Sequence, residues 1–239
     1  MEQIRTGLTG LKLQGMAACL ATLEETRRMH ELSFIDGLKL LIQAETDLRE
    51  SNRLERLIKN AAFRYKATIE ELAFDTARGI DKSQIMALAT GDYIRKGDAV
   101  LLTGATGTGK STLATALGMN SCRQGYTTAY WNMLKLLAKL KIARLEGNSI
   151  SLFDKLAKTD LLIIDDFGVS KMENQQQLDF LEIIEDRHAK KATIIASQLP
   201  VNKWFDVFNE ATIADSVLDR IVHSSYRFQL KGESLRKKL

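Results

Sequence analysis

The stretch LLTGATGTGKSTLATALG, residues 101–118, decides the fold of this chain. An apolar run gives way to a loop rich in glycine and threonine, and an amphipathic pattern follows. Residues 104–111 match G-x-x-x-x-G-K-[ST], in which glycines let backbone N–H groups turn inward around phosphate oxygens. The following helix would present its positive N-terminal end to the same anion. The sequence therefore predicts a phosphate-binding loop between a strand and a helix.

Two side chains of this loop carry chemistry. Lys110 is expected to reach the β- and γ-phosphates, and the Ser111 hydroxyl is expected to ligate Mg²⁺. ATP and Mg²⁺ are therefore the expected cofactors. The predicted ATP-binding residues are Gly104, Ala105, Thr106, Gly107, Thr108, Gly109, Lys110, Ser111 and Thr112.

Two further apolar runs end in polar residues that suit the same chemistry. LLIIDD places Asp165 and Asp166 after a buried strand, at the edge where ligands of open α/β folds bind. Asp165 would hold Mg²⁺ through water, and Asp166 would orient or deprotonate the attacking water. ATIIAS ends in Ser197 and Gln198, either of which could lie between Asp166 and the γ-phosphate. The alternative is a plain strand end.

Short apolar runs alternate with amphipathic helices from Asp98 onward, which predicts a parallel sheet covered on both faces. Residues 8–94 are predicted to be helical only, including a helical stripe over 8–23 and a short helix at TIEELAF. We expect a helical N-terminal domain over 1–96 and an α/β domain over 97–239. The expected strands are 99–103, 127–131, 161–165, 192–197 and 226–230, with helices from Lys110 and across 133–145, 173–189 and 201–223.

Composition excludes several classes of protein. The 239 residues contain no apolar run long enough to span a membrane, and the N-terminus lacks the apolar region of a signal peptide. Cys19 and Cys122 lie far apart, which indicates a reduced, cytoplasmic chain. The net charge of +4 is concentrated in basic segments, including residues 49–66. Such segments suit nucleic-acid phosphates or are solvated helix faces.

The helix ADSVLDRIVH contains Arg220 just before the last predicted strand. An arginine at this position can project toward the γ-phosphate held by a neighbouring subunit. The alternative is a basic residue that caps an exposed helix.

These residues resemble the IstB family, the ATP-dependent helpers of two-gene insertion sequences. That family is related to the DnaC helicase loader among initiator-type AAA+ ATPases. The motifs LKLQGMAACL, LLIIDDFG, IIASQLPVNKW and ADSVLDRIVHSSYRFQLKGESLRK carry the resemblance, in addition to the phosphate loop. The resemblance implies a P-loop NTPase of AAA+ initiator type, with an N-terminal domain used for oligomerisation, partner contacts or DNA contacts.

The resemblance also implies roles for single positions. Residues 104–111 match the Walker A loop, Asp165 and Asp166 match the Walker B pair, and Ser197-Gln198 match the sensor-one segment. Arg220 matches the arginine finger that acts across a subunit boundary, and Arg236 lies where a sensor-two arginine is sought. Position 166 is Asp where most of the superfamily has Glu, which predicts slow turnover. We expect no separate helical lid domain, because the sequence ends soon after residue 230.

In the initiator branch that this chain resembles, an extra helix after the second strand faces DNA. The corresponding residues supply Lys135, Lys139, Lys141 and Arg144, and Lys171 is a further candidate DNA contact. Basic side chains of this kind bind phosphates without reading sequence, and the alternative is a solvated helix face.

Three functions remain open at this point. The first is an ATPase that oligomerises on duplex DNA, selects or remodels it, and delivers it to the transposase of the same element, with hydrolysis as a disassembly switch. The second is a DnaC-like loader of the replicative helicase. The third is a stand-alone nucleotide kinase, which the sequence disfavours because no second substrate site is visible. The N-terminal segment RGIDKSQIMALATGDYI resembles that of the insertion-sequence helpers, which favours the first function.

Overall fold

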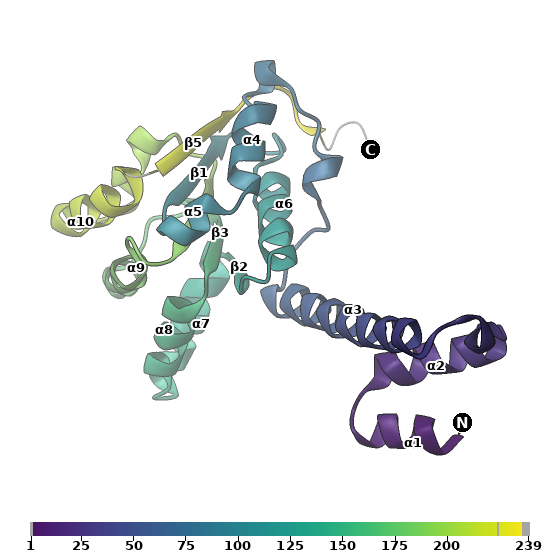
Figure 1. The fold of residues 1–239 in the computed structure, drawn as a ribbon. Coiled ribbons are helices and arrows are strands. Elements are labelled where there is room, and N and C mark those ends of the chain that lie inside the picture. Colours follow the sequence, from purple (N-terminus) through teal and green to yellow (C-terminus); the bar gives the residue numbers. More distant parts are fainter. Residues whose placement is uncertain (1, 224, 236–239) are drawn as a thin grey trace. The chain divides into compact units, whose positions relative to one another are not determined.

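The computed structural model describes residues 2–223 and 225–235, and the chain divides into two compact units, Met1–Arg56 and Leu57–Leu239. The first unit consists of helices (Figure 1). They are α1 (Glu2–Gly10), α2 (Gln14–Glu25), a 3-10 turn (Arg28–Glu31) and α3 (Phe34–Ala61), which continues past the boundary between the units.

One buried carboxylate joins α2 to α3. Glu45 Oε2 accepts hydrogen bonds from the backbone N–H groups of Gly15, at 2.8 Å, and Met16, at 3.3 Å. Gly15 is required at this crossing, because a Cβ there would lie 2.4 Å from the Ala44 carbonyl oxygen. The predicted helical stripe over residues 8–23 is in fact split between α1 and α2, since Lys12 adopts a left-handed conformation with φ of 62°.

The second unit is built on the predicted five-stranded parallel sheet, in the order β2-β3-β4-β1-β5. The carboxyl ends of the strands therefore meet at one edge, the edge that carries the phosphate-binding loop after β1. The strands are β1 (Ala99–Gly104), β2 (Thr128–Asn132), β3 (Leu161–Phe167), β4 (Ala192–Ser197) and β5 (Ser225–Leu230).

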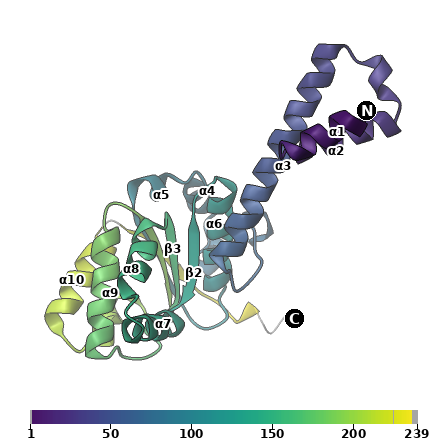
Figure 2. The same ribbon diagram turned by 90° about the horizontal axis from the view of Figure 1, so that it is seen from below.

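Helices cover both faces of this sheet (Figure 2). Alternating strand residues divide between two apolar clusters, with Val100 and Leu102 on one face and Leu101 on the other. The first face packs against α4 (Lys82–Ala89), α5 (Asp92–Lys96) and α6 (Lys110–Arg123). The second packs against α7 (Met133–Leu145), α8 (Ser149–Lys158), α9 (Asn174–Arg187) and α10 (Ala211–Val222).

The division between the units differs from the predicted boundary at residue 96. The structure groups residues 57–96 with the sheet, because Ile85, Tyr93 and Ile94 are buried in the same cluster as Val100 and Leu102. Helix α8 was not predicted from the sequence. Segments predicted as helix at TIEELAF and after residue 200 form 3-10 turns, at Ile69–Glu71, Thr76–Arg78, Val201–Lys203 and Phe205–Val207. Among the described residues, none of the helices has both the length and the apolar character needed to cross a bilayer.

Candidate ATP-binding site

The loop between β1 and α6 has the backbone that phosphate binding requires. Gly107 and Gly109 adopt φ of 83° and 102°, in the region that side chains rarely occupy. A Cβ at Gly107 would also lie 2.1 Å from Ser234 Oγ, so the loop has no room for another residue there. Helix α6 begins at Lys110 and directs its N-terminal end at the loop. The residues present therefore fit the phosphates of a nucleotide.

The Lys110 side chain is buried and folded over the same loop. Its ammonium group donates to the carbonyl oxygens of Gly104, at 2.7 Å, and Ala105, at 2.8 Å. A pocket lies alongside the loop, and Tyr65, from the segment after α3, contributes to its wall. Its lining comprises Tyr65, Gly107, Gly109, Lys110, Ser111, Thr112 and Leu235.

The segment after β5 forms another wall of this site. The backbone N–H of Leu235 donates to the Gly107 carbonyl at 2.9 Å. The Arg78 guanidinium donates to the Glu233 carbonyl at 2.9 Å, and the Lys231 N–H donates to the Arg78 carbonyl at the same distance. Residues 231–235 are thus held by Arg78 at one end and by the phosphate-binding loop at the other. Arg236, the predicted sensor-two arginine, lies outside the described residues.

Asp165 has a hydrogen-bond partner on β2, Tyr130. Asp165 is 1% exposed, and its carboxylate accepts a hydrogen bond from the Tyr130 hydroxyl. Burial, together with the Asp165 carboxylate, raises the pKa of Tyr130 well above its usual value, and the nearby Ser111 side chain opposes this rise only in part. Tyr130 therefore stays protonated. The two predicted Mg²⁺ ligands lie around one hydroxyl, which is an arrangement of hard oxygen donors that suits this ion.

Asp166 occupies an unusual backbone position. Its φ is 60°, and the register between β3 and β4 shifts between Ile164 and Phe167. The Asp166 Oδ2 atom accepts a hydrogen bond from Asn132 Nδ2 at 2.8 Å and lies 3.5 Å from a guanidinium nitrogen of Arg64. Because Asn132 pairs with Asp165 across β2 and β3, it ends its strand at the same edge as the carboxylates.

The two residues at the end of β4 have different surroundings. Ser197 is fully buried, and its hydroxyl donates to the Phe167 carbonyl at 2.7 Å and accepts from the Leu199 N–H at 3.1 Å. Gln198 instead faces the phosphate-binding loop, where its Oε1 accepts a hydrogen bond from the Thr106 hydroxyl at 2.8 Å. Of the two, only Gln198 contacts the loop in these hydrogen bonds.

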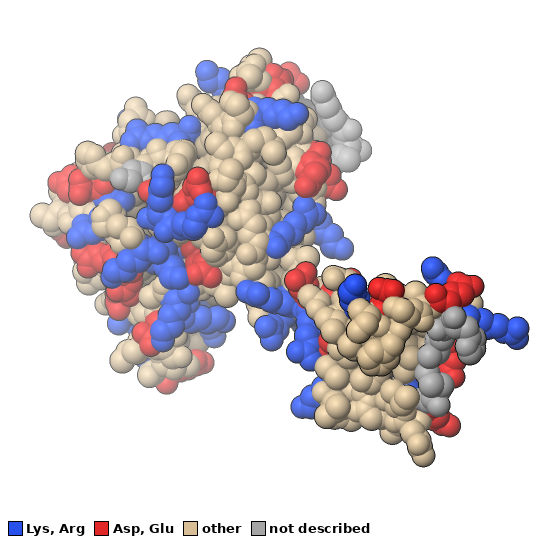
Figure 3. All heavy atoms as spheres, viewed as in Figure 1, with Lys and Arg blue, Asp and Glu red and all other residues tan. Residues whose placement is uncertain are grey.

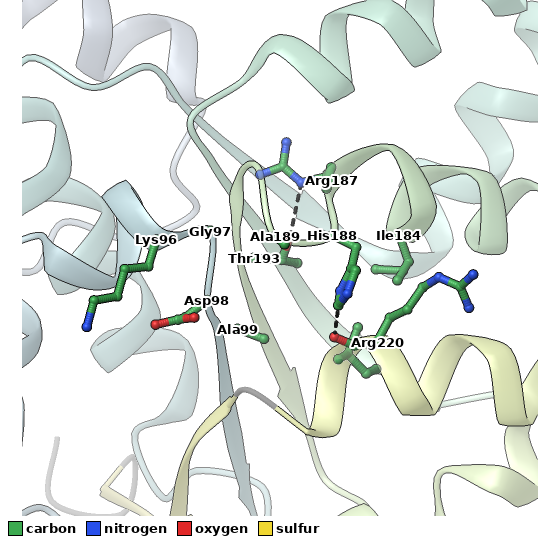
Figure 4. Close-up of a pocket in the computed structure, with 11 residues that line it drawn as sticks. Lys96, Gly97, Asp98, Ala99, Ile184, Arg187, His188, Ala189, Thr193 and Arg220 are labelled. Carbon is green, nitrogen blue, oxygen red and sulfur yellow. Dashed lines mark hydrogen bonds between the residues drawn. The ribbon is translucent and has the colours of Figure 1, made fainter.

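Arg220 lies at the opposite edge of the sheet from the loop. It lines a pocket with Ala99 and Thr193, which pair at the amino ends of β1 and β4 (Figure 4). Its guanidinium is directed away from the strands, binds Glu185 at 2.9 Å and donates to the Ser216 carbonyl at 2.6 Å. Six residues of β1 separate the two edges, a distance of roughly 16 Å at the usual rise per residue.

The predicted DNA contacts fall into two groups. Lys135, Lys139 and Lys141 are exposed on α7, and Lys171 is exposed in the loop after β3. Arg144 is instead bound to the buried carboxylate of Asp179, at 2.9 Å from Nε and 2.5 Å from a terminal nitrogen. This hydrogen bonding raises the pKa of Arg144.

Basic side chains also gather over α5 and the end of α9 (Figure 3). Arg95, Lys96 and Lys190 are exposed there, and the sequence analysis had not singled them out.

Three residues near the Walker B carboxylates were also missed. Asn132 could have been found, because it is a polar residue that directly follows the predicted strand 127–131. Tyr130 gave no signal, since a tyrosine within a strand pattern indicates core packing. Arg64 was one of several basic residues in segment 49–66, and nothing in the sequence distinguished it.

Comparison with known proteins identifies a family whose model matches almost the whole chain. Residues 6–239 match the family model of the IstB-like ATP binding protein. An insertion-sequence ATP-binding protein of Sinorhizobium fredii is 37% identical over 230 residues, which cover 96% of this chain and 94% of the relative. The crystal structure of the DnaC helicase loader has a TM-score of 0.56 at 18% identity, over 74% of this chain and 99% of that chain. AMPPCP-bound DnaA from Aquifex aeolicus has a TM-score of 0.61 at 18% identity, over 74% and 56%.

The two structural likenesses show the fold alone, which is that of the AAA+ P-loop NTPases. The family match and the identity with the Sinorhizobium fredii relative extend over almost all of the sequence. This chain is therefore a member of the IstB-like family of ATP-binding proteins of insertion sequences.

Proposed function

We propose that this protein is an ATPase that assembles on duplex DNA and delivers that DNA to the transposase encoded by the same insertion element. ATP hydrolysis would act as the switch that ends the assembly. The observation that carries the proposal is the meeting of a phosphate-binding loop with Asp165 and Asp166 at one edge of the sheet, in a chain of the insertion-sequence family.

Each residue of the site has a proposed task. Lys110 and the loop N–H groups would bind the phosphates, and Ser111 and Asp165 would hold Mg²⁺, which neutralises charge on the phosphates when bound. Asp166 would orient the attacking water and accept its proton. Gln198 is the better candidate for the sensor, because it already contacts Thr106 of the loop.

Arg220 would complete the site of a neighbouring subunit. The strands separate it from its own phosphate-binding loop, and its guanidinium is directed away from them. A cation supplied in this way stabilises charge that develops on the γ-phosphate. Self-assembly is therefore part of the proposed mechanism, and the helical residues 1–56 are available for oligomer, partner or DNA contacts.

DNA would be bound through its phosphates. Lys135, Lys139, Lys141 and Lys171 are exposed and can each neutralise a phosphate without reading a base. Arg144 is omitted from this proposal, because removing it from Asp179 would leave a buried carboxylate without its cation. Binding is expected to be largely independent of sequence.

Two substitutions test the proposed ATPase. Lys110→Ala should abolish ATP binding measured by calorimetry, since it removes the cation of the loop. Asp166→Asn should bind ATP with an affinity close to that of the wild type but hydrolyse it at least ~100-fold more slowly, because an amide cannot accept the proton from water. Lys158→Ala, which changes an exposed lysine of α8, is the control. Unchanged hydrolysis in Asp166→Asn would move the catalytic role to another residue.

A further inference from the structure

We propose that Arg64 is a positioning residue that restrains the Asp166 carboxylate and keeps basal ATP hydrolysis slow. This inference rests on the proposed ATPase function. It starts from the ion pair between Arg64 and Asp166, in which a guanidinium nitrogen lies 3.5 Å from Oδ2.

Arg64 is held at this place by its neighbours on both sides. The Phe63 ring packs edge-on against Tyr130, with ring centroids 6.4 Å apart, and a Cβ at Gly118 would lie 2.6 Å from the Phe63 ring. Tyr65 lines the pocket beside the phosphate-binding loop, and the Arg64 guanidinium lies over the Tyr65 ring at 5.2 Å. Phe63 and Tyr65 thus hold the chain on either side of Arg64, whose side chain reaches the Asp166 carboxylate.

The same oxygen of Asp166 is engaged twice. Asn132 Nδ2 donates to Oδ2 at 2.8 Å, and the Arg64 guanidinium approaches the same atom. Oδ2 is thus held by one hydrogen bond and one ion pair, and turning the carboxylate toward an attacking water would break both contacts. The carboxylate can turn to meet an attacking water only after these contacts loosen.

Although its neighbours fix the backbone at Arg64, its side chain is the more exposed of the two partners of Oδ2. Its side chain is 52% exposed, whereas Asn132 belongs to a strand within the sheet. The restraint is therefore one that partner binding could release.

The test measures steady-state ATP hydrolysis by the full-length chain without DNA. Arg64→Ala should raise kcat about two- to five-fold, the factor associated with one partly exposed ion pair, and leave KM for ATP unchanged. Arg64→Lys should hydrolyse ATP at close to the wild-type rate, because it keeps a cation in place. Lys66→Ala removes an exposed positive charge two residues away and should change neither constant. An unchanged or lower kcat in Arg64→Ala would overturn the proposal.

A second variant tests whether the gain depends on Asp166. Arg64→Ala combined with Asp166→Asn should be as slow as Asp166→Asn alone, and a raised rate in the double variant would contradict the restraint. Failure of the ATPase proposal is distinguishable, because the wild type would then show no hydrolysis that Lys110→Ala removes. If the wild type shows no such hydrolysis, hydrolysis that appears in Arg64→Ala and requires Lys110 would still support the restraint. If Arg64→Ala shows no such hydrolysis either, both proposals are overturned.

Discussion

At the scale of single residues, the hydroxyl of Tyr130 connects the two halves of the proposed Mg²⁺ site. It donates to Asp165, which is almost completely buried, and the Ser111 side chain of the phosphate-binding loop lies near it. Without this donor, Asp165 would lose a partner in a place that water does not reach. Such a loss costs about 1–3 kcal/mol, and more when the group is charged.

Tyr130→Phe should therefore lower both stability and activity. We expect the free energy of unfolding in urea to fall by about 1–3 kcal/mol, and Mg²⁺-dependent ATP hydrolysis to fall with it. Tyr126→Phe, a change to a half-buried tyrosine earlier in the same unit, is the matched control. Wild-type stability and hydrolysis in Tyr130→Phe would show that the hydroxyl does not support Asp165.

The site residues that could be predicted from the sequence are those that belong to a contiguous motif. Lys110 and Ser111 follow glycines at fixed spacing, and Asp165 follows a run of apolar residues. Arg64 reaches Asp166 only because the chain folds back over a distance that no local pattern records. Arg144 carries a charge that suits DNA, but the sequence did not show that a buried Asp179 lies opposite it.

At the scale of elements, Arg187 at the end of α9 connects the end of α8 to the amino end of β4. It is 1% exposed, and it donates to the carbonyl oxygens of Leu156, at 2.5 Å, and Thr159, at 2.8 Å, at the end of α8. It also donates to the Ala192 carbonyl and to the Thr193 hydroxyl of β4. Burial lowers the pKa of Arg187 to about 9, so the side chain remains charged at neutral pH.

Arg187→Leu should destabilise the protein strongly. Leucine fills much of the same volume but leaves several buried carbonyl groups without donors, and each costs about 1–3 kcal/mol. We expect the free energy of unfolding in urea to fall by roughly 3–5 kcal/mol, whereas Arg227→Leu, at an exposed position of β5, should change it little. A loss below about 1 kcal/mol would mean that these carbonyl groups find other partners.

The alternation of strands and helices was predictable because buried parallel strands form short apolar runs. Element ends were less predictable. A left-handed backbone at Lys12 splits the first helical stripe, and segments predicted as helix near residues 69 and 201 form 3-10 turns. Residues 57–96 have a helical pattern similar to that of residues 1–56, so only the packing of Ile85 and Tyr93 on the sheet reveals which unit they join.

At the scale of the whole molecule, the proposed catalytic site is divided between subunits. The phosphate-binding loop follows the carboxyl end of β1, whereas Arg220 lies in a pocket with Ala99 at its amino end. One chain therefore cannot bring Arg220 to its own loop without disrupting the sheet. A neighbouring chain can do so, which would make hydrolysis depend on assembly.

The most direct test of this arrangement mixes two inactive variants, Arg220→Ala and Lys110→Ala. Arg220→Ala should bind ATP normally but hydrolyse it on the order of 10³-fold more slowly, and Lys110→Ala should not bind ATP. In a mixed assembly, an intact loop on one subunit meets an intact Arg220 on the next. We predict that hydrolysis returns in part on mixing. No recovery, when the two variants are shown to assemble together, would contradict a site shared between subunits.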